Sequence, residues 1–183
     1  MSKQLSEKIS HHLRELREKN GWSLDIAAQQ TGVSKAMLGQ IERGESSPTI
    51  ATLWKIVTGF NESFSSFFAN PLVAAKISKK MRSKFIDADK MQVSIVFPYS
   101  ADTGIEVFEI ALISGHEQLS TAHYPGVIEH VLVTKGVVEI FFDGVWHLLR
   151  KGQTVRFDAN QAHGYANHSK KTAEFQNIIC YPR

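Results

Sequence analysis

The sequence contains one cysteine, Cys180, and five prolines among 183 residues. A single cysteine excludes a framework of intramolecular disulfides and a zinc site built from several cysteines. No stretch approaches the roughly 18 consecutive apolar residues that a membrane-spanning helix needs, and the N-terminal residues have no apolar core typical of a secretory signal. These absences predict a cytoplasmic protein without a membrane partner.

The net charge of +3 is unevenly distributed. Residues 71–90 carry six basic and two acidic side chains, whereas the segments on either side are nearly balanced. A basic segment of this kind can help to hold an anionic polymer or can be a solvated linker. We interpret residues 70–90 as a basic linker between two domains.

Residues 1–69 have the periodicity of a helical domain. Leu5, Ile9, Leu13 and Leu16 are spaced by four, four and three residues, so they share one helical face. Capping residues and apolar spacing predict three more helices, which begin after Ser23, after Ser34 and at Pro48. Phe64, Phe67 and Phe68 predict a short fifth helix. The first domain is therefore predicted to be a five-helix bundle.

Residues 91–183 show a different pattern of short apolar runs separated by glycines. This pattern predicts an all-β sandwich or barrel. The predicted strands are 92–99, 105–113, 128–133, 137–142, 155–157 and 175–181. The chain is thus predicted to have two domains, one helical and one made of strands.

The segment 23–44 predicts a helix-turn-helix. Two short helices meet at residues 31–34, where Gly32 can supply the positive φ of a tight turn. Such a pair can place its second helix in the major groove of DNA. If Leu38 and Ile41 face the core, the exposed face of the second helix consists of Ser34, Lys35, Ala36, Gly39, Gln40 and Arg43.

These side chains suit contacts with DNA. Lys35 can donate to guanine, Gln40 can pair with adenine, and Ala36 can contact a thymine methyl group. Ser34, Arg43 and the free N–H groups that follow Ser23 suit phosphates. The alternative is a helical bundle that does not bind DNA.

The string 32–49, which contains Ile41-Glu42-Arg43-Gly44 and Pro48, closely resembles the XRE helix-turn-helix family, whose bundles are like those of phage repressors such as lambda repressor. The resemblance spans about residues 9–68. It implies that Lys35, Ala36 and Gln40 read bases, that Ser34 and Arg43 contact the DNA backbone, and that Arg17 and Glu42 form an internal ion pair.

In the second domain, His123, Glu129 and His163 are candidate metal ligands, because two imidazoles and a carboxylate form a recurring metal triad. Tyr165 lies two residues after His163, so both side chains should face the same cavity. His130 should point to the opposite side of its strand from Glu129.

The spacing from Glu129 to Gly136, and from Gly152 through His163 to Asn167, resembles the two cupin motifs. The resemblance implies a jelly-roll β-barrel that holds a metal or a small ligand. It also implies a His-x-His pair at His123, but Pro125 occupies the second position, so one of the four family ligands is missing. Asp158 and Asn160 replace the usual proline and glycine of the second motif.

Three interpretations of this cluster remain open. His123, Glu129 and His163 could bind a divalent metal. With Tyr165 they could form a metal-free pocket that hydrogen-bonds a small effector. They could also be inert core residues. Of these, the metal-free effector pocket is the one we favour.

The whole chain resembles bacterial regulators that join an XRE reader to a cupin domain. Residues 32–43, 52–56, 97–99, 126–131 and 181–182 also resemble regulators of sulfur utilisation. This implies a transcription regulator that senses a small metabolite, with a role in sulfur metabolism. We expect a homodimer on a pseudo-palindromic double-stranded operator, since one helix-turn-helix makes few contacts. The alternatives are a metal-dependent cupin enzyme with an accessory helical domain, and a DNA-binding protein whose cupin domain only dimerises.

Overall fold

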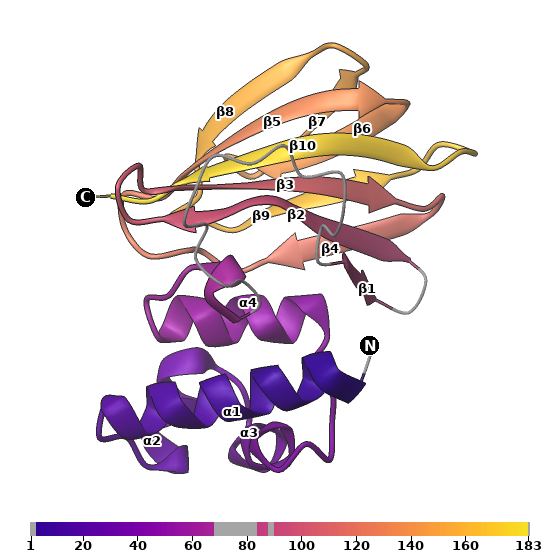
Figure 1. Cartoon of the computed structure of the whole chain (residues 1–183). Coiled ribbons are helices and arrows are strands. Elements are labelled where there is room, and N and C mark those ends of the chain that lie inside the picture. Colours follow the sequence, from indigo (N-terminus) through magenta and orange to yellow (C-terminus); the bar gives the residue numbers. More distant parts are fainter. Residues whose placement is uncertain (1–2, 68–83, 88–89, 183) are drawn as a thin grey trace. The chain divides into compact units, whose positions relative to one another are not determined.

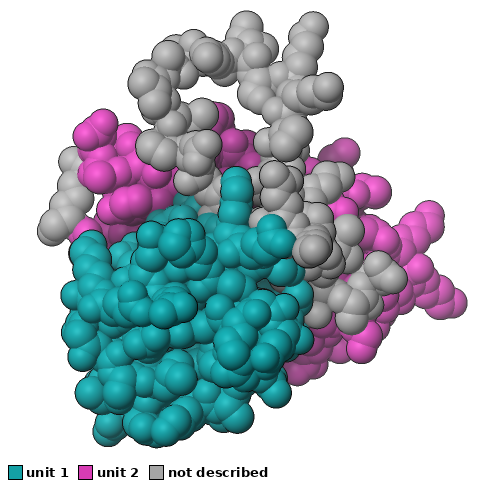
Figure 2. Space-filling model, turned by 60° about the horizontal axis from the view of Figure 1, so that its bottom comes forward, with its two compact units in different colours: residues 1–70 teal, residues 71–183 magenta. Residues whose placement is uncertain are grey.

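The computed structural model describes residues 3–67, 84–87 and 90–182. The chain divides into two compact units, residues 1–70 and residues 71–183 (Figure 2). Most of the predicted linker at 70–90 lies outside the described residues, but Lys84–Asp87 within it forms a strand. Among the described helices, none combines the length and the apolar character needed to cross a membrane.

The described part of the helical unit contains four α-helices and one short 3-10 helix, as the ribbon of Figure 1 allows the reader to follow. Their bounds are α1 (Lys3–Lys19), α2 (Leu24–Thr31), α3 (Lys35–Glu42), α4 (Ile50–Gly59) and η1 (Phe64–Phe67). Side-chain oxygens of Ser23, Ser34 and Thr49 accept hydrogen bonds from the backbone N–H groups that α2, α3 and α4 would otherwise leave unpaired. The periodic apolar residues meet in one core that includes Ile9, Leu13, Leu38, Ile41, Leu53 and Phe64.

Two details of the predicted bundle are wrong. The fifth element is a four-residue 3-10 helix, because the short stretch after α4 closes with a bond from Ser66 N–H to the Ser63 carbonyl. It still covers the core, since Phe64 and Phe67 are buried, whereas Phe68 lies outside the described residues. The cap of α4 is Thr49, so Pro48 precedes the helix instead of opening it.

The second unit contains ten described strands, all of which pair antiparallel within two sheets. Their bounds are β1 (Lys84–Asp87), β2 (Met91–Ser100), β3 (Ile105–Leu112), β4 (His116–Ser120), β5 (Ile128–Lys135), β6 (Val137–Phe142), β7 (Val145–Arg150), β8 (Thr154–Asp158), β9 (His163–Asn167) and β10 (Ala173–Cys180). The order is β1-β2-β3-β10-β5-β8 in one sheet and β4-β9-β6-β7 in the other. Figure 1 shows the two sheets as stacked layers.

The predicted closed barrel is therefore wrong for the described strands, which form a two-sheet sandwich. No described strand pairs across from one sheet to the other. The layers are held together by side chains of their inner faces, because alternate residues of β3, β5 and β10 are buried. Phe108, Val131, Ile140, Phe175 and Ile179 belong to this core.

Candidate DNA-binding face and buried polar cluster

The turn between α2 and α3 is built by three consecutive residues. Gly32 has φ of 65°, and its N–H donates to the Ala28 carbonyl to end α2. The Thr31 hydroxyl donates to the Ala27 carbonyl at 2.7 Å and accepts from Val33 N–H at 3.2 Å. This bonding fixes the angle at which the chain enters α3, and with it the direction of the exposed face of that helix.

The structure exposes all six residues predicted to contact DNA, namely Ser23, Ser34, Lys35, Ala36, Gln40 and Arg43. Leu38 and Ile41, on the other side of α3, are fully buried. Gly39, which we expected on the exposed face, is buried instead. A Cβ there would lie 3.1 Å from an Arg43 nitrogen. The Arg43 side chain therefore covers this turn of the helix.

Two cations of this face already have acidic partners. Lys35 Nζ lies 2.8 Å from an Asp25 carboxylate oxygen, and Arg43 makes two bonds of 2.8 and 2.7 Å to Glu45. All four side chains are exposed, so water screens these ion pairs and they are weak. A DNA phosphate or base can therefore replace either carboxylate at small cost.

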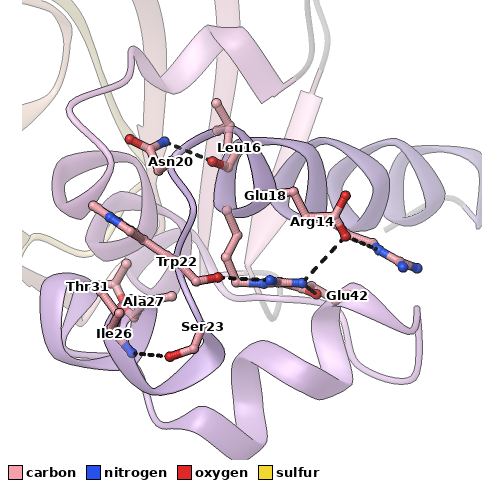
Figure 3. A network of polar contacts seen from close by, with 11 residues as sticks. Arg14, Leu16, Glu18, Asn20, Trp22, Ser23, Ile26, Ala27, Thr31 and Glu42 are labelled. Carbon is pink, nitrogen blue, oxygen red and sulfur yellow. Dashed lines mark hydrogen bonds and ion pairs between the residues drawn. The ribbon is translucent and has the colours of Figure 1, made fainter.

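Arg17 and Glu42 form the ion pair that the family resemblance implied. Arg17 donates to both Glu42 oxygens at 2.7 and 2.9 Å, and also to the Trp22 carbonyl at 3.0 Å (Figure 3). Side-chain exposure is 16% for Arg17 and 9% for Glu42. These charges connect α1, the turn that precedes α2 and the end of α3, so they belong to the scaffold.

In the β unit, the predicted residues His123, Glu129, His163 and Tyr165 come together around the Glu129 carboxylate. One oxygen, Oε1, lies 3.0 Å from His123 Nε2 and 3.4 Å from His163 Nε2. The other, Oε2, accepts hydrogen bonds from the Tyr165 hydroxyl and from Asn177 Nδ2, the latter at 2.9 Å. We call these five residues the polar cluster.

The polar cluster is assembled from four parts of the chain. Glu129 comes from β5, His163 and Tyr165 from β9, Asn177 from β10, and His123 from the loop before β5. A bond from His123 N–H to the Ala159 carbonyl anchors that loop. Sequence reasoning missed Asn177, although it is the one polar residue among the inward-facing positions Phe175, Asn177 and Ile179.

Burial and mutual contact shift the pKa values of the cluster. Burial raises the pKa of the Glu129 carboxyl, but the charge of His163 and the hydrogen bonds of both imidazoles outweigh it, and the pKa falls well below its usual value. Burial lowers the pKa of His163, but the charge and hydrogen bond of Glu129 and the hydrogen bond to the Gln161 carbonyl together outweigh it, and the net pKa is raised. Burial and the same charge both raise the pKa of the Tyr165 hydroxyl. Glu129 is therefore ionised and Tyr165 neutral at pH 7.

The cluster also offers the donor set of a metal site. One ligand atom from each of His123, Glu129 and His163 lies within 4.8 Å of the others. His163 Nδ1 is 2.9 Å from the Gln161 carbonyl, and metal-bound histidines commonly donate their other ring N–H to a carbonyl in this way. These three residues fit a divalent cation, which would supply a Lewis acid. Pro125 is exposed and adds no ligand.

His130 and Cys180, next to the polar cluster, lie where the alternation of side chains along β5 predicts. His130 is half-buried, and its Nδ1 lies 3.8 Å from Cys180 Sγ, on the side of the strand opposite the buried Glu129. Burial raises the pKa of the Cys180 thiol, which disfavours a reactive thiolate.

Comparison with known proteins assigns each unit to a protein family. The helix-turn-helix family profile matches residues 13–67, and the cupin domain profile matches residues 110–180. The HTH-type transcriptional regulator SutR of Escherichia coli is 45% identical over 175 residues, which covers 96% of each chain. The chain belongs to the XRE-type helix-turn-helix regulators with a cupin domain.

Two solved structures support this family assignment. An HTH_3 family transcriptional regulator from Vibrio cholerae is 49% identical, covers 100% of both chains and gives a TM-score of 0.88. The cupin domain of an XRE family regulator from Enterobacter cloacae is 40% identical over 51% of this chain and 98% of its own, with a TM-score of 0.50. Membership of this regulator family means DNA binding through the helix-turn-helix, and it favours regulation over the enzymatic alternative.

Proposed function

We propose that this XRE-cupin regulator binds a specific operator through α3 and that its cupin unit senses a small metabolite. The observation that carries the proposal is the division of α3 into a buried side, with Leu38 and Ile41, and an exposed side with base-reading chemistry. Lys35, Ala36 and Gln40 read bases, while Ser34, Arg43 and the N-terminus of α2 at Ser23 contact phosphates.

The regulator acts as a homodimer in the cytoplasm, where its operator DNA lies. One recognition helix of eight residues reads only a few base pairs, so specificity requires two copies. Their half-sites lie about one helical turn, roughly 34 Å, apart on a pseudo-palindrome.

The polar cluster supports the sensor role. Asn177 is 2% exposed, and its side-chain oxygen has no hydrogen-bond partner in the described part of the chain. An unpaired buried acceptor is costly, so it favours a bound molecule that donates a hydrogen bond. A sulfur-containing effector is the expectation drawn from the family resemblance, and it would link the regulator to sulfur metabolism.

The experiment that tests base reading uses the full chain. The operator is selected from random duplexes, and affinity is then measured for the operator and for a scrambled duplex. Gln40→Ala should lower the operator preference by about tenfold, because one bidentate base contact is worth roughly 1–3 kcal/mol. Gln30→Ala, an equally exposed glutamine at the far end of α2, is the matched control and should retain the preference. Equal losses on both duplexes for Gln40→Ala would contradict base reading.

A further inference from the structure

The two described sheets of the β unit end in four edge strands, namely β1, β8, β4 and β7. An edge strand with free backbone groups can pair with another chain, and proteins usually prevent this with charges, prolines or bulges. β1, β8 and β4 each carry an acidic side chain, at Asp87, Asp158 and Glu117. β7 has no acidic residue, no proline and no shift in its register with β6, and its only formally charged side chain is Arg150 at its end. β7 is therefore the least protected of the four described edges.

The backbone of β7 is open at two residues. Arg150 N–H donates to Gln153 Oε1 at 2.7 Å, and the Arg150 carbonyl accepts from Gln153 N–H at 2.9 Å, so both groups point away from β6. Alternation along the strand turns the backbone N–H and carbonyl groups of Trp146 and Leu148 to the same side. No described strand lies beyond β7 to bond with them. Trp146 and Leu148 therefore offer two donors and two acceptors at this edge.

The side chains of β7 are apolar and largely exposed. Val145 is 55% exposed and Leu148 is 53% exposed. Trp146 lies on the outer face of the sheet opposite its β6 partner Phe141, and their ring centroids are 5.2 Å apart. Leu149 points to the other side and is buried in the sandwich. An apolar strip on the outer face thus lies next to the open backbone groups.

The two ends of β7 carry opposite charges. Arg150 and Lys151 form its basic end, and Asp143 lies in the turn before its first residue. All three side chains are exposed, and none of them has an ion pair among the described residues. Asp143 accepts one hydrogen bond, from the neutral amide of Gln161, which leaves its second oxygen for another donor. Two antiparallel copies of β7 would place the basic end of each beside the acidic end of the other.

We propose that β7 is the dimer interface and that two copies of this chain pair β7 with β7, antiparallel, about a twofold axis at His147. Trp146 of each copy exchanges both backbone hydrogen bonds with Leu148 of the partner subunit. The basic end of β7 lies beside Asp143 of the partner subunit, and the two four-stranded sheets join into one sheet of eight strands. The proposal rests on the homodimer proposed above and names the surface through which it forms.

The open backbone groups select this register. A shift of two residues in one direction pairs Leu148 with Gly144, which lies in the turn before β7. A shift in the other direction pairs Trp146 with Arg150, whose backbone groups Gln153 already holds. A parallel pairing would bring the two basic ends together, where like charges repel. Only the antiparallel register centred on the residue between Trp146 and Leu148 uses every open group of both strands.

The first test measures the dimer Kd of the full-length protein by analytical ultracentrifugation over a range of concentrations. Leu148→Lys should raise this Kd about tenfold or more, because a charge on an edge strand opposes pairing with a second chain. Leu119→Lys is the matched control, since Leu119 is 57% exposed on β4, the other edge of the same sheet, and it should leave the Kd unchanged. Circular dichroism of both variants checks that the fold is retained.

The second test reads the register by cross-linking. At the twofold axis the two copies of His147 form a non-hydrogen-bonded pair, whose Cα atoms lie about 4.5 Å apart. This distance suits a disulfide, so His147→Cys in a Cys180→Ser background should give a covalent dimer under mild oxidation. Val145→Cys in the same background is the control, because the proposed register separates its two copies by about 13 Å, and it should not cross-link.

The outcomes separate this interface from the homodimer itself. A parent chain that stays monomeric at every concentration overturns both. A dimer that Leu148→Lys leaves intact, or that His147→Cys does not cross-link, overturns the β7 interface, while the homodimer stands. A dimer that Leu148→Lys weakens, that Leu119→Lys retains and that only His147→Cys cross-links supports both.

Discussion

The helical unit carries its candidate functional residues on its surface, whereas the β unit carries them in its interior. In the helical unit, the residues proposed to contact DNA are exposed, and all but Ser23 belong to α3 and its caps, while the ion pair of Arg17 and Glu42 serves the scaffold. In the β unit, the polar cluster is buried and draws on segments up to 54 residues apart, from His123 to Asn177. Exposed DNA-reading residues can therefore be changed without unfolding the chain, whereas changes in the polar cluster alter folding as well as function.

The largest effect is expected in the polar cluster. Glu129→Ala leaves His163, Tyr165 and Asn177 without their shared acceptor and opens a void in the sandwich. The free energy of unfolding of the β unit should fall by about 3–5 kcal/mol, the cost of removing one partner of a buried charge pair. Urea denaturation measures it, followed by the fluorescence of Trp146 in a background where Trp22 and Trp54 of the helical unit are replaced by phenylalanine. Glu117→Ala, on an exposed β4 position, is the control, and a loss of less than about 1 kcal/mol for Glu129→Ala would contradict the cluster's structural role.

An intermediate effect is expected for the ion pair of the helical unit. A double-mutant cycle with Arg17→Ala and Glu42→Ala should give a coupling energy of about 1–3 kcal/mol, because the pair is bidentate and largely buried. The cycle for Arg14 and Glu18, a fully exposed pair on the same helix, should give a clearly smaller coupling energy. Equal values would show that burial adds nothing to the Arg17–Glu42 pair.

The smallest effect is a pH dependence of the helical unit. Burial lowers the pKa of His12, only partly opposed by Glu62 and Glu15, and its Nε2 has no partner in the residues described. The unfolded chain then binds a proton more readily than the folded one as pH falls below 6.5. The helical Tm, followed by circular dichroism, should fall slightly between pH 7 and pH 5.5. His12→Phe should reduce this fall, whereas His11→Gln, at an exposed neighbour, should not.

Local signals predicted the helical unit well. The capping serines, Gly32 and the apolar spacing act within a few residues, so the four α-helices and the exposed face of α3 follow from short-range rules. The errors also have local causes. Gly39 is buried because the Arg43 side chain turns back over it, and the last turn is 3-10 because it is too short for an α-helix.

Long-range assembly limited the prediction of the β unit. The motif spacing identified His123, Glu129, His163 and Tyr165, and the structure brings all four together. It missed Asn177, since a polar residue in an apolar strand has no meaning until its neighbours across the sheet are known. We predicted a barrel, but the described strands form a two-sheet sandwich. The sequence did not separate the two, because buried and exposed residues alternate along a strand in the same way in either architecture.

By itself the sequence determined the four α-helices, six of the ten described strands, the family of each unit and the chemistry of α3, because these depend on residue order over short distances; it missed β1, β4, β7 and β9. Only the tertiary structure decided that the Glu129 carboxylate joins two imidazoles, a phenol and an amide, and that β7 lies at an edge of its sheet. Arrangements of this kind depend on how β5, β6, β7, β9 and β10 pair and stack, which residue order does not state directly.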